Sequence, residues 1–269
     1  RGENPQGQIA VASPDPRFLK EARTVEATTQ EVAATPELKV FAHAVRFTGL
    51  KPATEYSYRV GDGKTFSEWI HFRTASAEAK PFAFIYFGDA QNDIKSLWSR
   101  TIRRAFRDLP YADLMLHAGD LINIPTADHE WGEWFEAGGW VHATIPTLAT
   151  PGNHEYARVG ETRQLTHLWR PHFALPANGP AGLEQTACYV DLQGVRFISL
   201  NSNERIPEQT RWLESILQNN PNRWTVVIFH HPVYSTAKGR DNPQIREAWQ
   251  PLFQKYNVAL VLQGHDHTY

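Results

Sequence analysis

The chain carries two kinds of hydrophobic patterning, and the change falls near residue 77. In the first part, apolar and polar residues alternate in short runs at residues 8–12, 24–28, 40–47 and 56–60. A period of two predicts half-buried β-strands. Glycines on both sides of Asp62 allow the positive φ of a tight hairpin turn, so residues 66–74 are predicted as the returning strand. We therefore expect a small all-β domain at residues 1–77.

Beyond a linker of small residues that ends at Pro81, short apolar runs alternate with segments of helical periodicity. This order is typical of βαβ units that build a parallel sheet. Strands are predicted at residues 82–87, 114–118, 147–149, 195–200, 225–229 and 259–262. Helices are predicted at residues 94–107, 131–137, 208–218 and 245–255. We therefore expect an α/β domain at residues 78–269.

Composition narrows the class of protein. The 27 basic and 29 acidic residues nearly cancel, so we expect no nucleic-acid partner. No run of 18 apolar residues predicts a transmembrane helix, and we expect no membrane partner. The single cysteine, Cys188, excludes an internal disulfide and a thiolate cluster, and we expect it to be buried on a strand around Tyr189. The chain begins at Arg1 rather than methionine, which suggests a processed or trimmed N-terminus.

Polar clusters follow five of the predicted strands. In open α/β sheets, functional groups gather beyond the carboxyl ends of the strands. Asp89 and Asp120 end consecutive parallel strands about one βαβ unit apart, so they should lie side by side, and one carboxylate can bridge two metal ions. Asn153 offers an amide oxygen, and imidazole ligands come from His230 and the pair His265 and His267. This donor set predicts a site for two metal ions that activate water.

Two details of the clusters concern their local geometry. In a strand-like segment, residues i and i+2 point the same way, so His265 and His267 should address neighbouring metal ions. His154, beside Asn153, can reach the substrate instead of the metal. Each cluster alone also has an ordinary explanation as a turn, a helix cap or a surface strand. All five in this order, each at a strand end, favour a functional site.

The chain resembles a known superfamily, the calcineurin-like metallophosphoesterases, in five motifs that occur in the same order: Gly88-Asp89, Gly119-Asp120, Gly152-Asn153-His154-Glu155, Val227-x-x-His230 and Gly264-His265-x-His267. In addition, residues 50–58 resemble the E–F corner of a fibronectin type III module, where a tyrosine hydroxyl bonds back to the backbone. Together these features most resemble the purple acid phosphatases. The resemblance implies a four-layer α/β/β/α sandwich preceded by a fibronectin-like β domain, with both domains truncated here.

The resemblance also implies roles for the clustered residues. Asp89, Asp120 and His267 would bind one metal, usually iron. Asp120 would bridge to a second metal (zinc, manganese or iron) bound by Asn153, His230 and His265. A metal-bound hydroxide would attack phosphorus, and His154 would hydrogen-bond the phosphate or protonate the leaving group. Asp120 and His154 are thus the expected catalytic residues, and the expected substrate contacts are His154, His231 and Tyr156.

Two positions depart from the family pattern. Purple acid phosphatases carry a tyrosine where this chain has Asn123, and most other superfamily members carry a histidine where it has Gln91. Either amide could donate an extra oxygen ligand, so we expect no purple colour and leave iron, zinc and manganese open. Serine/threonine phosphatases match less well, because Pro151 stands in the place of their arginine before the Gly-Asn-His-Glu motif.

The expected function is a phosphomonoesterase that acts on a phosphorylated small molecule or phosphoprotein. A phosphodiesterase or nucleotidase on the same metal centre is the second hypothesis, because no motif specifies the leaving group. A third is a non-catalytic surface binding module, favoured by the fibronectin-like domain and by the altered positions Gln91 and Asn123. The other expected ligands are all present, which favours an enzyme. The resemblance implies a secreted or periplasmic location, and the oligomeric state has no signal in the sequence.

Overall fold

The structure is a computed structural model that describes residues 4–34 and 39–267. Contacts between residues divide the chain into two units. The first comprises Arg1–Ala77 and Ala143–Ile145, and the second comprises Glu78–His142 and Pro146–Tyr269. Among the described residues, no helix combines the length and the apolar character that crossing a membrane requires.

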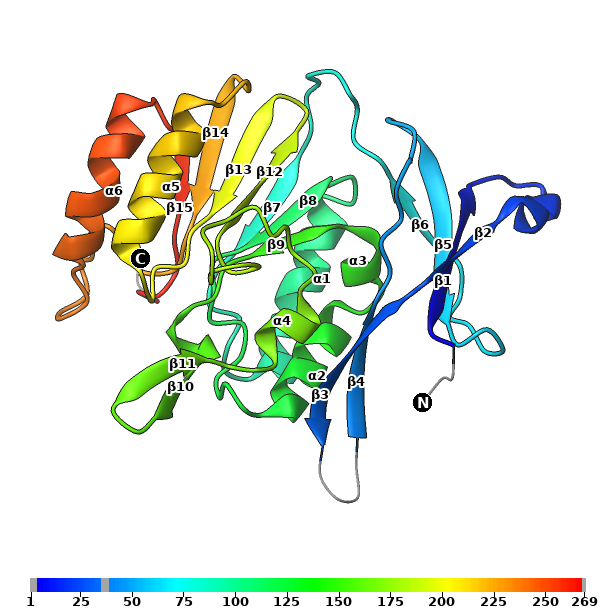
Figure 1. The fold of residues 1–269 in the computed structure, drawn as a ribbon, viewed down its shortest axis with the longest axis horizontal. Coiled ribbons are helices and arrows are strands. Elements are labelled where there is room, and N and C mark those ends of the chain that lie inside the picture. Colours follow the sequence, from blue (N-terminus) through cyan, green and yellow to red (C-terminus); the bar gives the residue numbers. More distant parts are fainter. Residues whose placement is uncertain (1–3, 35–38, 268–269) are drawn as a thin grey trace. The chain divides into compact units, whose positions relative to one another are not determined.

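The first unit is built from antiparallel strands. A four-stranded sheet has the order β2-β1-β5-β6, and β3 pairs separately with β4 (Figure 1). The strands are β1 (Gln6–Val11), β2 (Arg23–Glu26), β3 (Thr28–Ala34), β4 (Lys39–Ala44), β5 (Glu55–Gly61) and β6 (Ile70–Arg73), with a 3-10 helix η1 at Pro16–Glu21. The predicted run at residues 24–28 is divided between β2 and β3, because the Ala27 N–H bonds to the Pro5 carbonyl instead of continuing a ladder.

The predicted turn and corner of the first unit are confirmed. The side chain of Asp62 accepts the backbone N–H groups of Lys64 and Thr65 and so closes the hairpin, although the regular returning strand begins at Ile70 rather than residue 66. The buried Tyr56 hydroxyl accepts the Lys51 N–H at 2.9 Å. This bond ties the corner to the backbone, as the fibronectin-like pattern predicted.

The second unit contains two sheets that face each other (Figure 1). The first is parallel, with the order β7-β8-β9, and in the second, β12-β13-β14-β15, only the pair β12 and β13 is antiparallel. The strands are β7 (Phe84–Phe87), β8 (Leu114–His117), β9 (Thr147–Ala149), β12 (Cys188–Leu192), β13 (Val195–Ser199), β14 (Trp224–Ile228) and β15 (Leu260–Leu262). The sheets meet where the rings of Phe84 and Phe197 contact edge to face, 5.5 Å between centroids.

Helices cover the outer face of each sheet, which gives the predicted α/β/β/α order. On the first sheet, Trp98 packs on Phe87 and Trp134 packs on His117. On the second sheet, Leu213 and Trp249 join the core formed by the strands. The helices are the π-helical turn η2 (Ile94–Trp98), α1 (Ser99–Asp108), α2 (Asp128–Gly138), α3 (Trp140–Thr144), α4 (Trp169–His172), α5 (Ile206–Gln218) and α6 (Pro243–Lys255).

Several elements of this unit were not predicted. The hairpin of β10 (Tyr156–Val159) and β11 (Thr162–Leu165) is largely polar, and α3 and α4 are too short to show helical periodicity. Cys188 is buried at the start of β12, as predicted, and burial raises the pKa of its thiol to about 12. The parallel strands all end toward one edge, and the polar clusters lie there.

Candidate metal centre

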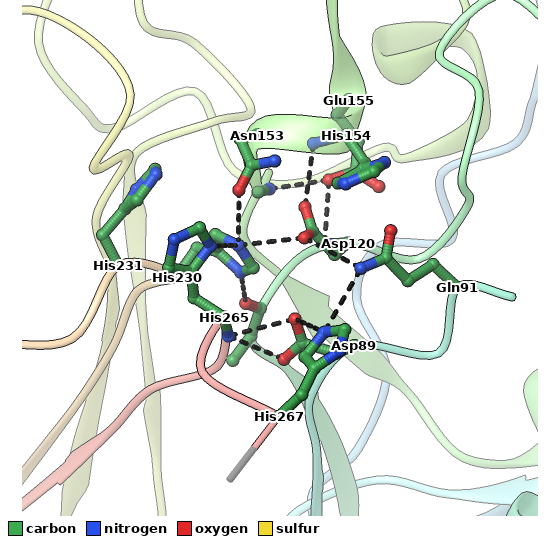
Figure 2. Close-up of polar contacts among 12 residues, drawn as sticks. Asp89, Gln91, Asp120, Asn153, His154, Glu155, His230, His231, His265 and His267 are labelled. Carbon is green, nitrogen blue, oxygen red and sulfur yellow. Dashed lines mark hydrogen bonds and ion pairs between the residues drawn. The ribbon is translucent and has the colours of Figure 1, made fainter. Parts of the chain in front are cut away.

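The clustered residues meet at the carboxyl ends of five parallel strands (Figure 2). The loops after β7, β8, β9, β14 and β15 supply Asp89, Asp120, Asn153, His230 and His265 respectively. Residues separated by up to 178 positions in the sequence thereby come within hydrogen-bonding distance. The predicted set is brought together as the strand order requires.

The backbone at this edge is left-handed at several ligand candidates. Asp89 and Asp120 have φ values of 51° and 52°, and His265 and His267 have 78° and 50°. Such conformations of non-glycine residues cost about 1–3 kcal/mol each and gather at functional sites. The prediction of a strand-like geometry at the two histidines was wrong, because β15 ends at Leu262 and both residues have a left-handed backbone. Their rings nevertheless face different parts of the site (Figure 2).

Four donor atoms converge in the first part of the site. The Nε2 atom of His230 lies 3.1 Å from each of three atoms, namely Asp120 Oδ2, Asn153 Oδ1 and His265 Nδ1. The other ring nitrogen of His230 donates to the Ala118 carbonyl at 2.7 Å, which leaves the Nε2 lone pair free. Ligands about 2.0–2.2 Å from one ion lie roughly 3.0–3.5 Å apart. These four side chains therefore fit a single metal ion.

A second group of donors adjoins the first. His267 Nε2 lies 3.1 Å from Asp89 Oδ1, and the Gln91 side-chain nitrogen lies 3.3 Å from His267 Nε2. The same nitrogen is 3.4 Å from Asp120 Oδ2, so Asp120 lies between the two groups. This arrangement fits two neighbouring ions that share one carboxylate.

Glycine permits the close approach of the loops. A Cβ on Gly152 would lie 2.2 Å from Asp120 Oδ1, and one on Gly264 would lie 2.4 Å from Asp89 Oδ2. A side chain at either position would displace a carboxylate that the site uses. The glycines in these two motifs are thus explained by contacts across loops rather than within them.

The electrostatics of the site favour a cation. Burial raises the pKa of Asp89, against the opposing effect of His230. Burial is the largest single effect on Asp120 and acts to raise its pKa, but the contacts of the carboxylate with His230 and His154 together outweigh burial, and the pKa is lowered. Burial lowers the pKa of His265 to about 4. Among the described residues, the basic side chains within ion-pairing distance of the two carboxylates are histidines, not lysine or arginine, so the carboxylate charge is available to metal ions.

Glu155 is a buried contributor that the sequence analysis left without a role. Its Oε2 accepts the backbone N–H groups of Asp120 (2.9 Å) and Gly152 (2.6 Å), and its Oε1 accepts that of Leu121 (2.8 Å). Burial, followed by the charge of Asp120, raises the pKa of Glu155 to about 7. The residue holds two loops of the site together. The sequence signal for this role was its place at the end of the Gly152-Asn153-His154-Glu155 motif.

His154 is placed beside the donor atoms without being one of them. Its backbone N–H donates to Asp120 Oδ1 at 2.8 Å, and its ring Nδ1 lies 2.7 Å from the backbone carbonyl of Asn123. A carbonyl can only accept, so Nδ1 carries the proton and Nε2 remains for a substrate. Asn123 itself borders a separate cavity of about 480 Å³.

The other expected substrate contacts lie on one side of the site. His231 and Tyr156 border a cavity of about 600 Å³ that also reaches Asn153. The His231 Nδ1 pairs with the Ser202 hydroxyl at 2.9 Å, and burial lowers the pKa of its ring to about 3. The Tyr156 hydroxyl donates to Glu204 at 2.5 Å. Both side chains therefore adjoin the metal centre with polar partners of their own.

Comparison with known families agrees with the fold. Residues 83–269 match the family model described as calcineurin-like phosphoesterase, and residues 2–74 match that of the purple acid phosphatase N-terminal domain. The first match covers most of the chain. The chain belongs to the calcineurin-like phosphoesterase family and carries the N-terminal domain of purple acid phosphatases.

Two relatives illustrate the similarity. An uncharacterized protein of Mycobacterium tuberculosis is 29% identical over 275 residues, 88% of this chain and 51% of the relative. Purple acid phosphatase 15 of Arabidopsis thaliana is 29% identical over 264 residues, 84% of this chain and 48% of the relative. The chain thus spans about half the length of the curated relatives it matches.

A solved structure supports the fold. The purple acid phosphatase PPD1 from yellow lupin (Lupinus luteus) seeds aligns with a TM-score of 0.81 at 20% sequence identity, over 98% of this chain and 53% of that chain. At this identity the likeness establishes the fold alone. The predicted purple acid phosphatase-like architecture is confirmed.

Proposed function

We propose that this protein is a dinuclear metal-dependent phosphomonoesterase of the acid phosphatase type. The observation that carries the proposal is the convergence of Asp120, Asn153, His230 and His265 on one point, beside Asp89 and His267. Carboxylate, amide and imidazole donors suit iron, zinc or manganese. Family membership supports phosphoester hydrolysis as the reaction.

Each of the clustered residues would have a separate role in the reaction. Asp120 would bridge the ions, Asp89 and His267 would hold one, and Asn153, His230 and His265 would hold the other. When bound, the two ions supply an activated water and stabilise charge on the phosphoryl oxygens. When the ring carries a proton on both nitrogens, the Nε2–H of His154 would hydrogen-bond the phosphate or pass its proton to the leaving group, while Nδ1–H stays on the Asn123 carbonyl.

The cavity that reaches Asn153, His231 and Tyr156 would receive the rest of the substrate. Its polar lining suits a phosphorylated small molecule or an exposed phosphorylated side chain of a protein. The secreted or periplasmic location and the absence of nucleic-acid partners stay predictions from the sequence.

The test compares a phosphomonoester with a phosphodiester. The protein is stripped of metal, reloaded with manganese, iron or zinc, and assayed with p-nitrophenyl phosphate and bis-p-nitrophenyl phosphate. We expect metal-dependent turnover of the monoester that Asp120→Ala abolishes. The exposed Asp108→Ala serves as the matched control. Preference for the diester would replace the proposal with a phosphodiesterase, and folded protein without turnover under any metal would leave a binding module.

A further inference from the structure

One buried amide in the metal centre has an unusual set of neighbours. Gln91 is 8% exposed, and its backbone N–H donates to the Asp120 carbonyl at 3.0 Å. Its side-chain nitrogen lies 3.4 Å from Asp120 Oδ2, which accepts its N–H, and 3.3 Å from His267 Nε2. Its Oε1 atom is buried and has no hydrogen-bond partner among the described residues. A buried amide oxygen without a partner is costly unless it serves another state of the site.

From this geometry we propose that Gln91 is a protein ligand of the metal ion held by Asp89 and His267. The inference rests on the dinuclear centre proposed above. Without a cation, the amide turns its N–H₂ group toward Asp120 Oδ2 and the Nε2 atom of His267, two atoms whose lone pairs would bind a metal ion. A cation uses those same lone pairs, so an N–H donor can no longer point at them. A half-turn of the terminal amide would then bring Oε1 to the ion in place of the N–H₂ group that would otherwise point at it.

The other altered position, Asn123, is placed differently. Its backbone N–H donates to Glu130 Oε2 at 2.7 Å, and its carbonyl pairs with His154 Nδ1 at 2.7 Å. The residue borders a separate cavity together with Asp93 and Glu133, and among the described residues no hydrogen bond joins its side chain to the metal centre. Asn123 therefore acts on His154 through its main chain. Of the two amides that the sequence left open as ligands, Gln91 is the one at the metal centre.

A neutral ligand at residue 91 limits the total positive charge of metal ions that the ligand set can compensate. The donor set contains two carboxylates, Asp89 and Asp120, and its other members are neutral amides and imidazoles. A neutral oxygen compensates a trivalent ion less than an anionic phenolate would. We therefore expect two divalent ions, which give no charge-transfer colour.

The test measures metal binding instead of turnover. Metal-free protein is titrated with Mn²⁺, the bound ions per chain are measured by equilibrium dialysis, and electron paramagnetic resonance detects coupling between paired ions. We expect the native chain to bind two coupled ions. Gln91→Leu should lower the affinity for one of the two ions by at least about tenfold. Even residues that only hydrogen-bond to metal ligands are worth roughly 10–100-fold in affinity. Asn123→Leu should keep both.

A rescue variant separates ligation from folding. Gln91→Glu keeps an oxygen at the same place, so we expect it to bind the second ion at least as tightly as the native chain, even where Gln91→Leu folds poorly. If Gln91→Leu binds both ions normally, or if Gln91→Glu fails to keep the weaker ion, the inference is wrong and the dinuclear centre stands. If the native chain itself binds fewer than two ions, the dinuclear centre and the inference fail together.

Discussion

The carboxylate of Glu155 holds the backbone of Asp120, whose N–H donates to Oε2 at 2.9 Å. The same oxygen accepts the Gly152 N–H at 2.6 Å. One buried acid therefore sets the distance between the loop that carries the bridging candidate Asp120 and the loop that carries Asn153 and His154. This contact makes the geometry of the site depend on a residue that the metal ions would not touch.

Replacing this acid should loosen the site. In Glu155→Gln, one oxygen becomes an N–H₂ group that meets backbone N–H donors, and a buried donor left unpaired costs about 1–3 kcal/mol. We expect the free energy of unfolding in urea to fall by about that amount and Mn²⁺ affinity to fall with it. Glu136→Gln, an exposed site on α2, is the control. Unchanged affinity in a destabilised Glu155→Gln would show that the loops are positioned by other contacts.

His154 should separate catalysis from metal binding. Its ring nitrogen Nδ1 bonds to a backbone carbonyl and takes no part in the converging donor set, so His154→Ala should retain both ions. General acid catalysis is typically worth 10²–10⁴-fold, so we expect kcat to fall within that range. Phenyl phosphate, with its poorer leaving group, should lose more than p-nitrophenyl phosphate. An equal loss on both esters would assign the ring to phosphate binding instead of proton transfer.

The tyrosine corner of the first unit is testable by hydrogen exchange. Tyr56→Phe removes the acceptor for the Lys51 N–H but keeps the ring, which stacks on Phe72 with centroids 5.9 Å apart. We expect faster deuterium uptake in the peptide that covers residues 50–58 and a loss of about 0.5–1.5 kcal/mol in unfolding free energy. Tyr111→Phe, at an exposed side chain, is the control. Unchanged exchange in Tyr56→Phe would mean that the bond adds nothing to the corner.

The ligand candidates were readable from the sequence because each follows a buried apolar run, and strand order then brings them together. The features of the site that could not be predicted belong to the backbone and do not depend on side-chain type. The carbonyls of Ala118 and Asn123 orient His230 and His154, and a backbone carbonyl occurs at every residue. The left-handed turn at His265 and His267 is set by contacts with Asp89, far away in the chain. The local pattern of apolar and polar residues contains no information about such long-range contacts.

Two buried histidines beneath the first sheet predict a loss of stability in acid. His117 packs against Trp98 and Trp134, and the ring of His142 stacks on Trp134 with centroids 4.3 Å apart. Burial lowers the pKa of His117 well below its usual value and that of His142 to about 4. In the unfolded chain both would titrate near 6.5. Below that pH, the unfolded chain therefore binds protons that the folded chain cannot.

The free energy of unfolding should consequently decrease as the pH falls from about 6.5 toward 4, by up to about 1.4 kcal/mol per pH unit for each histidine. His142→Phe keeps an aromatic ring against Trp134 and removes one titrating group. Urea unfolding of metal-free protein at pH 7 and pH 5 should show a smaller loss in this variant than in the native chain. The exposed His129→Phe should behave as the native chain does. A difference between His142→Phe and the native chain that is the same at both pH values would show that proton uptake by His142 is not the cause, because only a titrating group makes that difference vary with pH.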